Sequence, residues 1–139
     1  MKLLDTNIIL YAAGRPHTYK MACARLVEEI ALGGDEYAID AELLQEVLYV
    51  YASRGELARG LNAFDDLLRI LPNPLPIGRA EMVTARWLLE RYPALSPRDA
   101  IHAAVVQTHG LEGIVTTDRA FRQVSGLAVF DPRDLAQGG

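Results

Sequence analysis

The chain has 139 residues, of which half are hydrophobic and 23% are charged, and its formal net charge is −4 with a pI near 5.3. These values are typical of one globular domain, here residues 1–139, and they exclude a disordered chain. The single cysteine excludes an intrachain disulfide and a zinc site made of several thiolates, and the acidity excludes nucleic-acid binding by overall positive charge alone.

The first half of the chain alternates short apolar segments with helical patterns. Residues 1–5 (MKLLD) predict a buried strand that runs into a turn near Asp5. Polar residues interrupt this apolar run, so we interpret it as neither a signal peptide nor a membrane span, and we expect a cytoplasmic protein. Apolar residues at helical spacing predict a helix over residues 17–32, which stops at a pair of glycines. Residues 37–40 (YAID) predict a second short strand.

The second half contains more helices and two further strands. Helical patterns cover, in order, residues 41–53, 56–71, 79–92 and 96–110, with a proline-rich extended segment after the second of them. Residues 113–118 (GIVTTD) predict a strand that stops on an acid, and residues 127–131 (LAVFD) predict a last strand before a short helical turn. Strands separated by helices indicate βαβ units and therefore an α/β fold with a parallel sheet.

Two acidic residues stand where predicted strands end. Asp5 ends the first strand, and Asp118 ends the GIVTTD segment. In parallel sheets ligands collect at the carboxyl ends of the strands, so these two residues are candidates for one site. An acid within an apolar run is costly unless it is paired or binds a cation. The alternative for each residue is an N-cap that starts the following helical segment.

Asp99 and Glu46 are two further candidate acids, both on predicted helices. The SPRD sequence that ends at Asp99 is a capping-box pattern, and an acid fixed in the first turn of a helix can also face a metal ion. At about 100° per residue, Glu46 lies at the edge of the apolar stripe of the 41–53 helix, whereas Glu42 falls nearer the solvent. The alternative for Glu46 is an ordinary surface glutamate.

Together, Asp5, Glu46, Asp99 and Asp118 predict a cluster of oxygen ligands, which selects hard cations such as Mg²⁺ or Mn²⁺. Two such ions about 4 Å apart can activate water and stabilise the leaving oxygen in phosphodiester cleavage. Bound cations would also allow an acidic protein to accept a polyanionic substrate.

Four motifs occur in the order and spacing of PIN-domain proteins: MKLLDTNIILY, LLQEVLYVY, SPRDAIHAAVV and GIVTTDRAF, followed by FDP near Asp131. The chain most closely resembles the VapC-like toxin ribonucleases of toxin–antitoxin pairs, and the resemblance spans essentially its whole length. It implies a three-layer α/β/α fold with a central parallel sheet of four to five strands. It also implies Mg²⁺- or Mn²⁺-dependent endonucleolytic cleavage of RNA by metal-activated water, a homodimer and a cognate antitoxin.

The resemblance also implies roles for individual residues. It assigns metal binding and catalysis to Asp5, Glu46, Asp99 and Asp118, and the orientation of these ligands to Thr6, Asn7 and Thr117. Some PIN nucleases carry a further acid after the last one, where this chain has Arg119 and Ala120. A fifth ligand is therefore missing from the pattern, and we expect the second metal position to be weak.

Several other side chains have two interpretations. Candidates for contacts with RNA phosphates, or alternatively for plain surface charges, are Arg15, Lys20, Arg98, Arg119 and Arg122. His102 lies one helical turn after Asp99 and is either a metal ligand or, as its apolar neighbours favour, a hydrogen-bonded core histidine. We expect Trp87 and the tyrosines to lie in the core rather than to form base-stacking platforms.

Three other functions are compatible with parts of this pattern. A PIN nuclease that processes RNA or DNA flaps without an antitoxin is disfavoured by the short chain, which leaves no room for an extra substrate-binding domain. A non-catalytic metal-binding docking module is disfavoured because all four acids are present. A small phosphatase would need a DxD nucleophile, where this chain has DTN.

Overall fold

The computed structural model describes residues 1–14, 16–34 and 36–135. The strands are β1 (Lys2–Leu4), β2 (Tyr37–Ala38), β3 (Gly113–Val115) and β4 (Val129–Phe130). The helices are α1 (Thr6–Ala13), α2 (Lys20–Ala31), α3 (Ala41–Ser53), α4 (Leu57–Ile70), α5 (Arg79–Arg91), α6 (Pro97–Thr108) and α7 (Pro132–Leu135), with a 3-10 helix, η1, over Arg119–Gln123.

The four strands form one parallel sheet with the order β2-β1-β3-β4. Leu3 in the central strand β1 pairs with Ala38 on one side and with Ile114 on the other. All carboxyl ends of a parallel sheet meet at one edge, and each crossover between parallel strands needs a long connection, here built from helices. The expected parallel sheet of four to five strands is confirmed.

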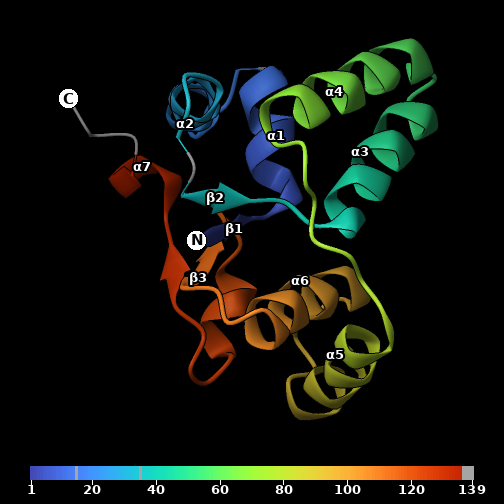
Figure 1. The fold of residues 1–139 in the computed structure, drawn as a ribbon, viewed down its shortest axis with the longest axis vertical. Helices are drawn as coiled ribbons and strands as arrows, with labels where there is room; N and C mark the ends of the chain where they lie inside the picture. Colours follow the sequence, from blue (N-terminus) through green and yellow to red (C-terminus); the bar gives the residue numbers. More distant parts are fainter. Residues whose placement is uncertain (15, 35, 136–139) are drawn as a thin grey trace.

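Helices cover both faces of the sheet, which gives the three expected layers. Successive strand residues point to opposite faces, so Leu4 and Val115 pack toward α1–α4, whereas Leu3 and Ile114 pack toward α5, α6 and η1. Figure 1 shows α1–α4 on one side of the strands and α5 with α6 on the other. Burying both faces of a sheet is the usual arrangement for parallel strands.

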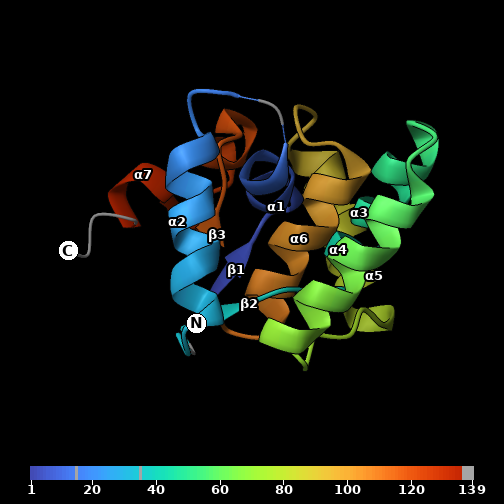
Figure 2. The same cartoon turned by 90° about the horizontal axis from the view of Figure 1, so that it is seen from above.

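Two helix pairs extend the layer that contains α1. Helices α3 and α4 pack against each other as a hairpin, with Gly55 at a φ of +71° in the turn, a conformation that glycine adopts without strain. Helix α2 packs on α1 and contacts α7, and Figure 2 shows α2 and α7 side by side at one end of the molecule. The long α3–α4 hairpin and the α2–α7 pair therefore lie at opposite ends of this layer (Figure 2).

Most expected helix boundaries agree with the structure within about three residues, and two expectations do not hold. Helix α1 is absent from the pattern-based prediction, because its sequence TNIILYAA is nearly continuously apolar and shows no helical period. Trp87 is 51% exposed and Tyr49 is 59% exposed, so the expectation that these aromatic residues lie in the core is wrong for both. On α5 it is Ala85 and Leu88 that face the core, and Trp87 falls on the outer side of the helix.

Within the described residues, no helix combines the length and the apolar character needed to cross a bilayer.

Candidate active site

Polar side chains gather where three neighbouring strands end. Asp40 follows β2, Asp5 follows β1, and Thr116 follows β3, and all three residues are buried. Because β2, β1 and β3 are adjacent and parallel, these positions lie along the same edge of the sheet. The sheet topology therefore brings together residues that are up to 111 positions apart in the sequence.

Asp5 lies at the centre of this edge, and both of its carboxylate oxygens are held. The backbone N–H of Thr6 donates to Oδ1 at 2.7 Å, and the Thr116 hydroxyl donates to Oδ2 at 2.7 Å. Asp5 is also the N-cap of α1. Burial raises the pKa of its carboxyl group, with the charge of Glu46 adding to this effect, while His102 and the two hydrogen bonds oppose it.

His102 connects Asp5 to a second buried acid, Asp40. Its Nδ1 lies 2.7 Å from Oδ2 of Asp40, and its Nε2 lies 3.6 Å from Oδ1 of Asp5 and 3.4 Å from the Thr6 hydroxyl. The imidazole is completely buried. Burial favours the neutral ring, but the hydrogen bond and charge of Asp40, with Asp5 and Glu46, raise the pKa of His102 to about 9. His102 is thus buried and hydrogen-bonded, while its Nε2 also lies in the group that Asp5 and Glu46 form.

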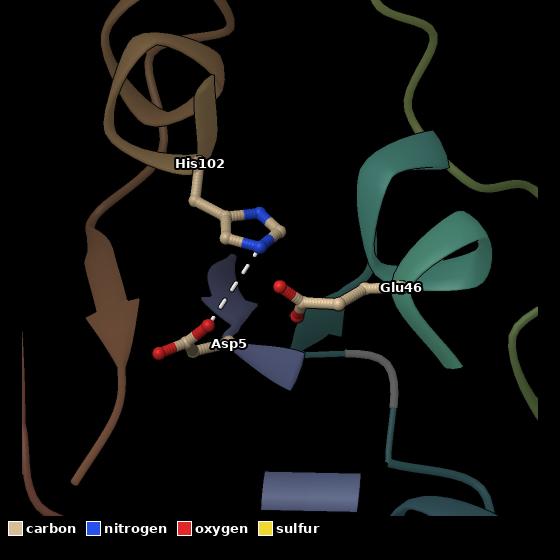
Figure 3. Close-up of side chains that lie close together, drawn as sticks. All are labelled: Asp5, Glu46 and His102. Atoms are coloured by element: carbon tan, nitrogen blue, oxygen red, sulfur yellow. Dashed lines mark ion pairs between the residues drawn. The ribbon is translucent and has the colours of Figure 1, made fainter. Parts of the chain in front are cut away.

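Glu46 reaches the cluster from α3. It is 8% exposed, as expected for an acid at the edge of an apolar stripe, and its Oε1 pairs with the Arg98 guanidinium at 2.8 Å. One ligand atom from each of Asp5, Glu46 and His102 lies within 4.8 Å of the other two. Figure 3 shows the three side chains pointing toward one another, with Asp5 just after β1, Glu46 on α3 and His102 on α6.

Asp99 and Asp118 border this cluster but lie outside its tightest part. Ser96 accepts a hydrogen bond from the Asp99 backbone N–H, so the expected helix start is present. Burial, followed by the charges of Asp5 and Asp118, raises the pKa of Asp99 to about 6. Because their charges act on Asp99, Asp5 and Asp118 both lie near that carboxylate. Asp118 caps η1 by accepting from the Ala120 N–H at 2.9 Å.

The residues expected to orient the ligands have distinct positions. Thr6 holds Asp5 through its backbone and contacts His102 through its hydroxyl. The Asn7 amide donates to the Thr116 hydroxyl at 3.4 Å, and the Asp118 N–H donates to the same hydroxyl at 2.9 Å. In the described part of the chain, the hydroxyl that reaches Asp5 is therefore that of Thr116, one residue before the expected Thr117.

The basic residues expected to contact phosphates are spread over several surfaces. Arg98 is engaged by Glu46, Lys20 is half-buried at the start of α2, and Arg119 and Arg122 are exposed on η1 beside Asp118. Arg15 lies outside the described residues.

Asp40 is the site residue that sequence reasoning missed. A signal for it was present, because YAID ends on an acid just as MKLLD and GIVTTD do. Asp40 also caps α3 by accepting from the Leu43 N–H at 2.9 Å. Its burial depends on His102, 62 residues later, and no local pattern encodes that contact.

The donor set fits a hard divalent cation. Carboxylate oxygens are the ligands that Mg²⁺ and Mn²⁺ favour, and burial, with the charges of neighbouring carboxylates, raises the pKa values of Asp5 and Asp99 in the absence of a cation. In addition, Oδ1 of Asn7 is buried and has no hydrogen-bond partner among the described residues. A buried acceptor beside the carboxylates is suited to a water molecule or another donor.

A groove of about 740 Å³ opens next to this cluster. It begins at Asn7 and is lined on one side by Tyr11 and His17, whose rings stack with centroids 4.3 Å apart. Its other side carries the guanidinium groups of Arg54 and Arg59, with Arg59 paired to Glu56. The groove thus combines aromatic surface with positive charge.

The chain is similar to several curated proteins over most of its length. It is 36% identical over 127 residues to Ribonuclease VapC13 of Mycobacterium tuberculosis, which covers 91% of this chain and 97% of that protein. It is 34% identical over 118 residues to Ribonuclease VapC23 of the same organism, covering 85% of this chain and 93% of that protein.

Solved structures share the fold at lower sequence identity. FitAcB from Neisseria gonorrhoeae matches with a TM-score of 0.72 and 20% identity, covering 95% of this chain and 98% of that chain. A toxin–antitoxin complex from Klebsiella pneumoniae matches with a TM-score of 0.66 and 24% identity, with the same coverage.

A family model described as the PIN domain matches residues 2–127. The parallel sheet, the acids at its carboxyl edge, the relatives and this match agree, and the chain belongs to the PIN-domain family.

Proposed function

We propose that this protein is a metal-dependent endoribonuclease and the toxin of a type II toxin–antitoxin pair, acting as a single domain in the cytoplasm. The observation that carries the proposal is the buried pair Asp5 and Glu46, joined at the carboxyl edge of the sheet by Asp99 and Asp118. The ribonuclease names of relatives at 34–36% identity support the reaction class.

In this proposal the four acids hold Mg²⁺ or Mn²⁺. A cation bound there would act as a Lewis acid, which would lower the pKa of a water molecule and stabilise charge on the phosphate. Thr116 and the Thr6 N–H fix both oxygens of Asp5 before substrate arrives, so little reorganisation is needed. Burial of Asp5 and Glu46 limits competing solvent and strengthens electrostatic interactions at the site.

The groove beside Asn7 provides a path for the RNA. Its positive groups, Arg54 and Arg59, suit phosphates, and Tyr11 with His17 offers aromatic surface to unpaired bases. Arg119 and Arg122 are exposed on η1, which directly follows Asp118, and they add basic side chains there. The acids and the basic groups would thus engage successive phosphates of one strand.

An antitoxin and a second copy of the chain are the proposed protein partners. Solved structures with the same fold are described as a toxin–antitoxin complex from Klebsiella pneumoniae and as VapBC2 from Rickettsia felis bound to a promoter DNA fragment. For a homodimer, α5 offers exposed apolar side chains at Met82, Val83 and Trp87. Exposed apolar groups gathered on one helix mark an interaction surface.

We expect Trp87→Arg to convert a wild-type dimer to a monomer, because truncating or charging an aromatic anchor typically weakens association by about thirtyfold or more. Light scattering after size exclusion gives the mass directly. Met21→Arg, at a residue of α2 that is 65% exposed, is the matched control and should leave the mass unchanged. A monomeric wild type would rule out the proposed dimer.

The function itself is tested by incubating the purified protein with a pool of labelled structured RNAs in Mg²⁺, in Mn²⁺ and in EDTA. We expect cleavage at defined internal sites that requires the metal. Cleavage that persists in EDTA would contradict the proposed mechanism. Metal binding without cleavage of any RNA would favour the docking-module alternative.

Metal should stabilise the protein more at high pH than at low pH. The pKa of Asp99 is about 6 in the folded protein, above its value of 3.8 in the unfolded chain. Protonation of Asp99 therefore stabilises the metal-free fold. This stabilisation is fully present below about pH 3.8 and is lost as the pH rises through about 6. Protons therefore compete with the cation. At a hundredfold excess over Kd, we expect Mn²⁺ to raise the Tm by roughly 5–10 °C at about pH 8 and by clearly less at about pH 5. Equal shifts at both pH values would argue against carboxylate ligands.

A further inference from the structure

We propose that His102 is a positioning residue for the metal site: Asp40 locks its imidazole so that Nε2 faces Asp5 and holds that carboxylate in the orientation that binds the cation. The inference rests on the proposed function only in taking Asp5 as a metal ligand. It adds to the site two residues, His102 and Asp40, that need not touch the cation.

The ring is locked from the Asp40 side. Oδ2 of Asp40 lies 2.7 Å from Nδ1 of His102, and Oδ1 of Asp40 accepts the Leu43 N–H at 2.9 Å. Both oxygens of Asp40 are therefore engaged, and neither side chain is exposed. Turning the ring over would break the shortest hydrogen bond of the histidine inside a closed core, so its orientation is fixed.

The opposite edge of the ring faces the groups that hold Asp5. Nε2 lies 3.6 Å from Oδ1 of Asp5, within ion-pair distance, and 3.4 Å from the hydroxyl of Thr6. The N–H of Thr6 donates to the same Oδ1. Figure 3 shows the imidazole directed at Asp5, with Glu46 on the other side of the gap. His102 thus braces both the carboxylate and the first residue of α1.

A metal ligand is the competing role, since ligating histidines often rest on a carboxylate through their other nitrogen. Two features favour positioning. Nε2 lies 3.4 Å from the Thr6 hydroxyl, which is hydrogen-bond distance, and the remaining donors are carboxylates that suit Mg²⁺ or Mn²⁺ without nitrogen. The two roles predict different spectra, so the experiment separates them.

The test uses two variants in which a side-chain amide takes the place of one of the two ring nitrogens of His102. In His102→Asn the amide can replace Nδ1 and keep the contact with Asp40, but it cannot reach Asp5. In His102→Gln the amide can reach the Nε2 position beside Asp5. Mn²⁺ affinity is measured by the loss of the free Mn²⁺ signal in electron paramagnetic resonance, and unfolding in EDTA checks the fold of each variant.

We expect His102→Asn to weaken Mn²⁺ binding by about 10–100-fold and His102→Gln to stay within about threefold of wild type. Wild-type affinity in the asparagine variant, or equal losses in both variants, would overturn the proposal. A nitrogen coupling from a directly bound imidazole in the pulsed spectrum of wild type would overturn it in favour of a ligand. If His102→Asn does not fold, Asp40→Ser, which keeps a helix cap but is too short to hold Nδ1 of His102, should lower Mn²⁺ affinity about tenfold, and unchanged affinity would count against the proposal.

The outcome is separable from that of the proposed ribonuclease activity, because Mn²⁺ binding is measured without RNA. If the affinities change as expected but no RNA is cleaved, only the proposed function fails. If RNA is cleaved and Asp5 is required, but His102→Asn binds Mn²⁺ normally, only the positioning role fails.

Discussion

Asp5→Asn is expected to lower the rate of RNA cleavage by about a thousandfold or more, which corresponds to roughly 4 kcal/mol of lost transition-state stabilisation. The amide keeps the size of the side chain and can still accept the Thr6 N–H. It carries no negative charge, however, and is a poor ligand for Mg²⁺. Single-turnover cleavage of the RNA found in the screen gives the rate. Asp66→Asn, at an exposed carboxylate of α4, is the matched control and should cleave normally.

Asp5→Asn should not unfold the protein. Burial raises the pKa of Asp5, so its charge opposes folding in the absence of metal, and this effect grows as the pH rises above 3.8. The metal-free variant should therefore melt at the same temperature as wild type or above it. Lost cleavage accompanied by a large fall in the melting temperature would mean that Asp5 acts through the fold rather than through the metal.

Asp40→Ala is expected to give the largest loss of stability among changes near the site. It leaves His102 buried without its hydrogen-bonded partner, which typically costs about 3–5 kcal/mol, and it removes the N-cap of α3, which adds about 1 kcal/mol. Urea unfolding in EDTA measures this free energy. Asp40→Asn is the control, because asparagine can cap the helix and accept a hydrogen bond from the imidazole. Its free energy of unfolding should fall much less than that of Asp40→Ala.

The difference in unfolding free energy between wild type and Asp40→Ala should also depend on pH. The pKa of His102 is about 9 in the folded protein, above its ordinary value of 6.5. The stabilisation is therefore fully present below about pH 6.5 and is lost as the pH rises through about 9. The charged groups that face His102 are Asp5, Asp40, Glu46, Glu42 and Asp99. A difference in unfolding free energy that grows toward pH 9 would contradict this account.

Much of the fold follows from the order of elements, because strands separated by helices leave few arrangements besides a covered parallel sheet. Asp5 and Asp118 could be assigned to one edge from sequence alone, since each ends a predicted strand, although β3 itself stops at Val115, three residues before Asp118. What the pattern could not supply was contact between distant segments. Glu46 pairs with Arg98 and Asp40 with His102 only because α3 and α6 meet above that edge.

Acids that cap a helix also lie in or beside the acidic cluster in this fold. Asp5 caps α1, Asp40 caps α3, and Asp118 caps η1, and each of these acids also contributes to the cluster or its surroundings. The exposure of Trp87 could not be predicted in the same way. A large aromatic residue within a helical pattern usually faces the core, and nothing in the nearby sequence indicated that this side of α5 is uncovered.

Because Asp5 and Asp118 both cap helices and lie in or beside the acidic cluster, their mutation has a genetic consequence. Asparagine is as good an N-cap as aspartate, and a single G-to-A transition converts an aspartate codon to an asparagine codon. If the active protein harms its host, a single mutation of the Asp5 codon to an asparagine codon would abolish RNA cleavage. The mutated gene would still encode a folded chain. Natural variants that lose the charge of Asp5 or Asp118 should therefore carry asparagine more often than residues that cannot cap a helix.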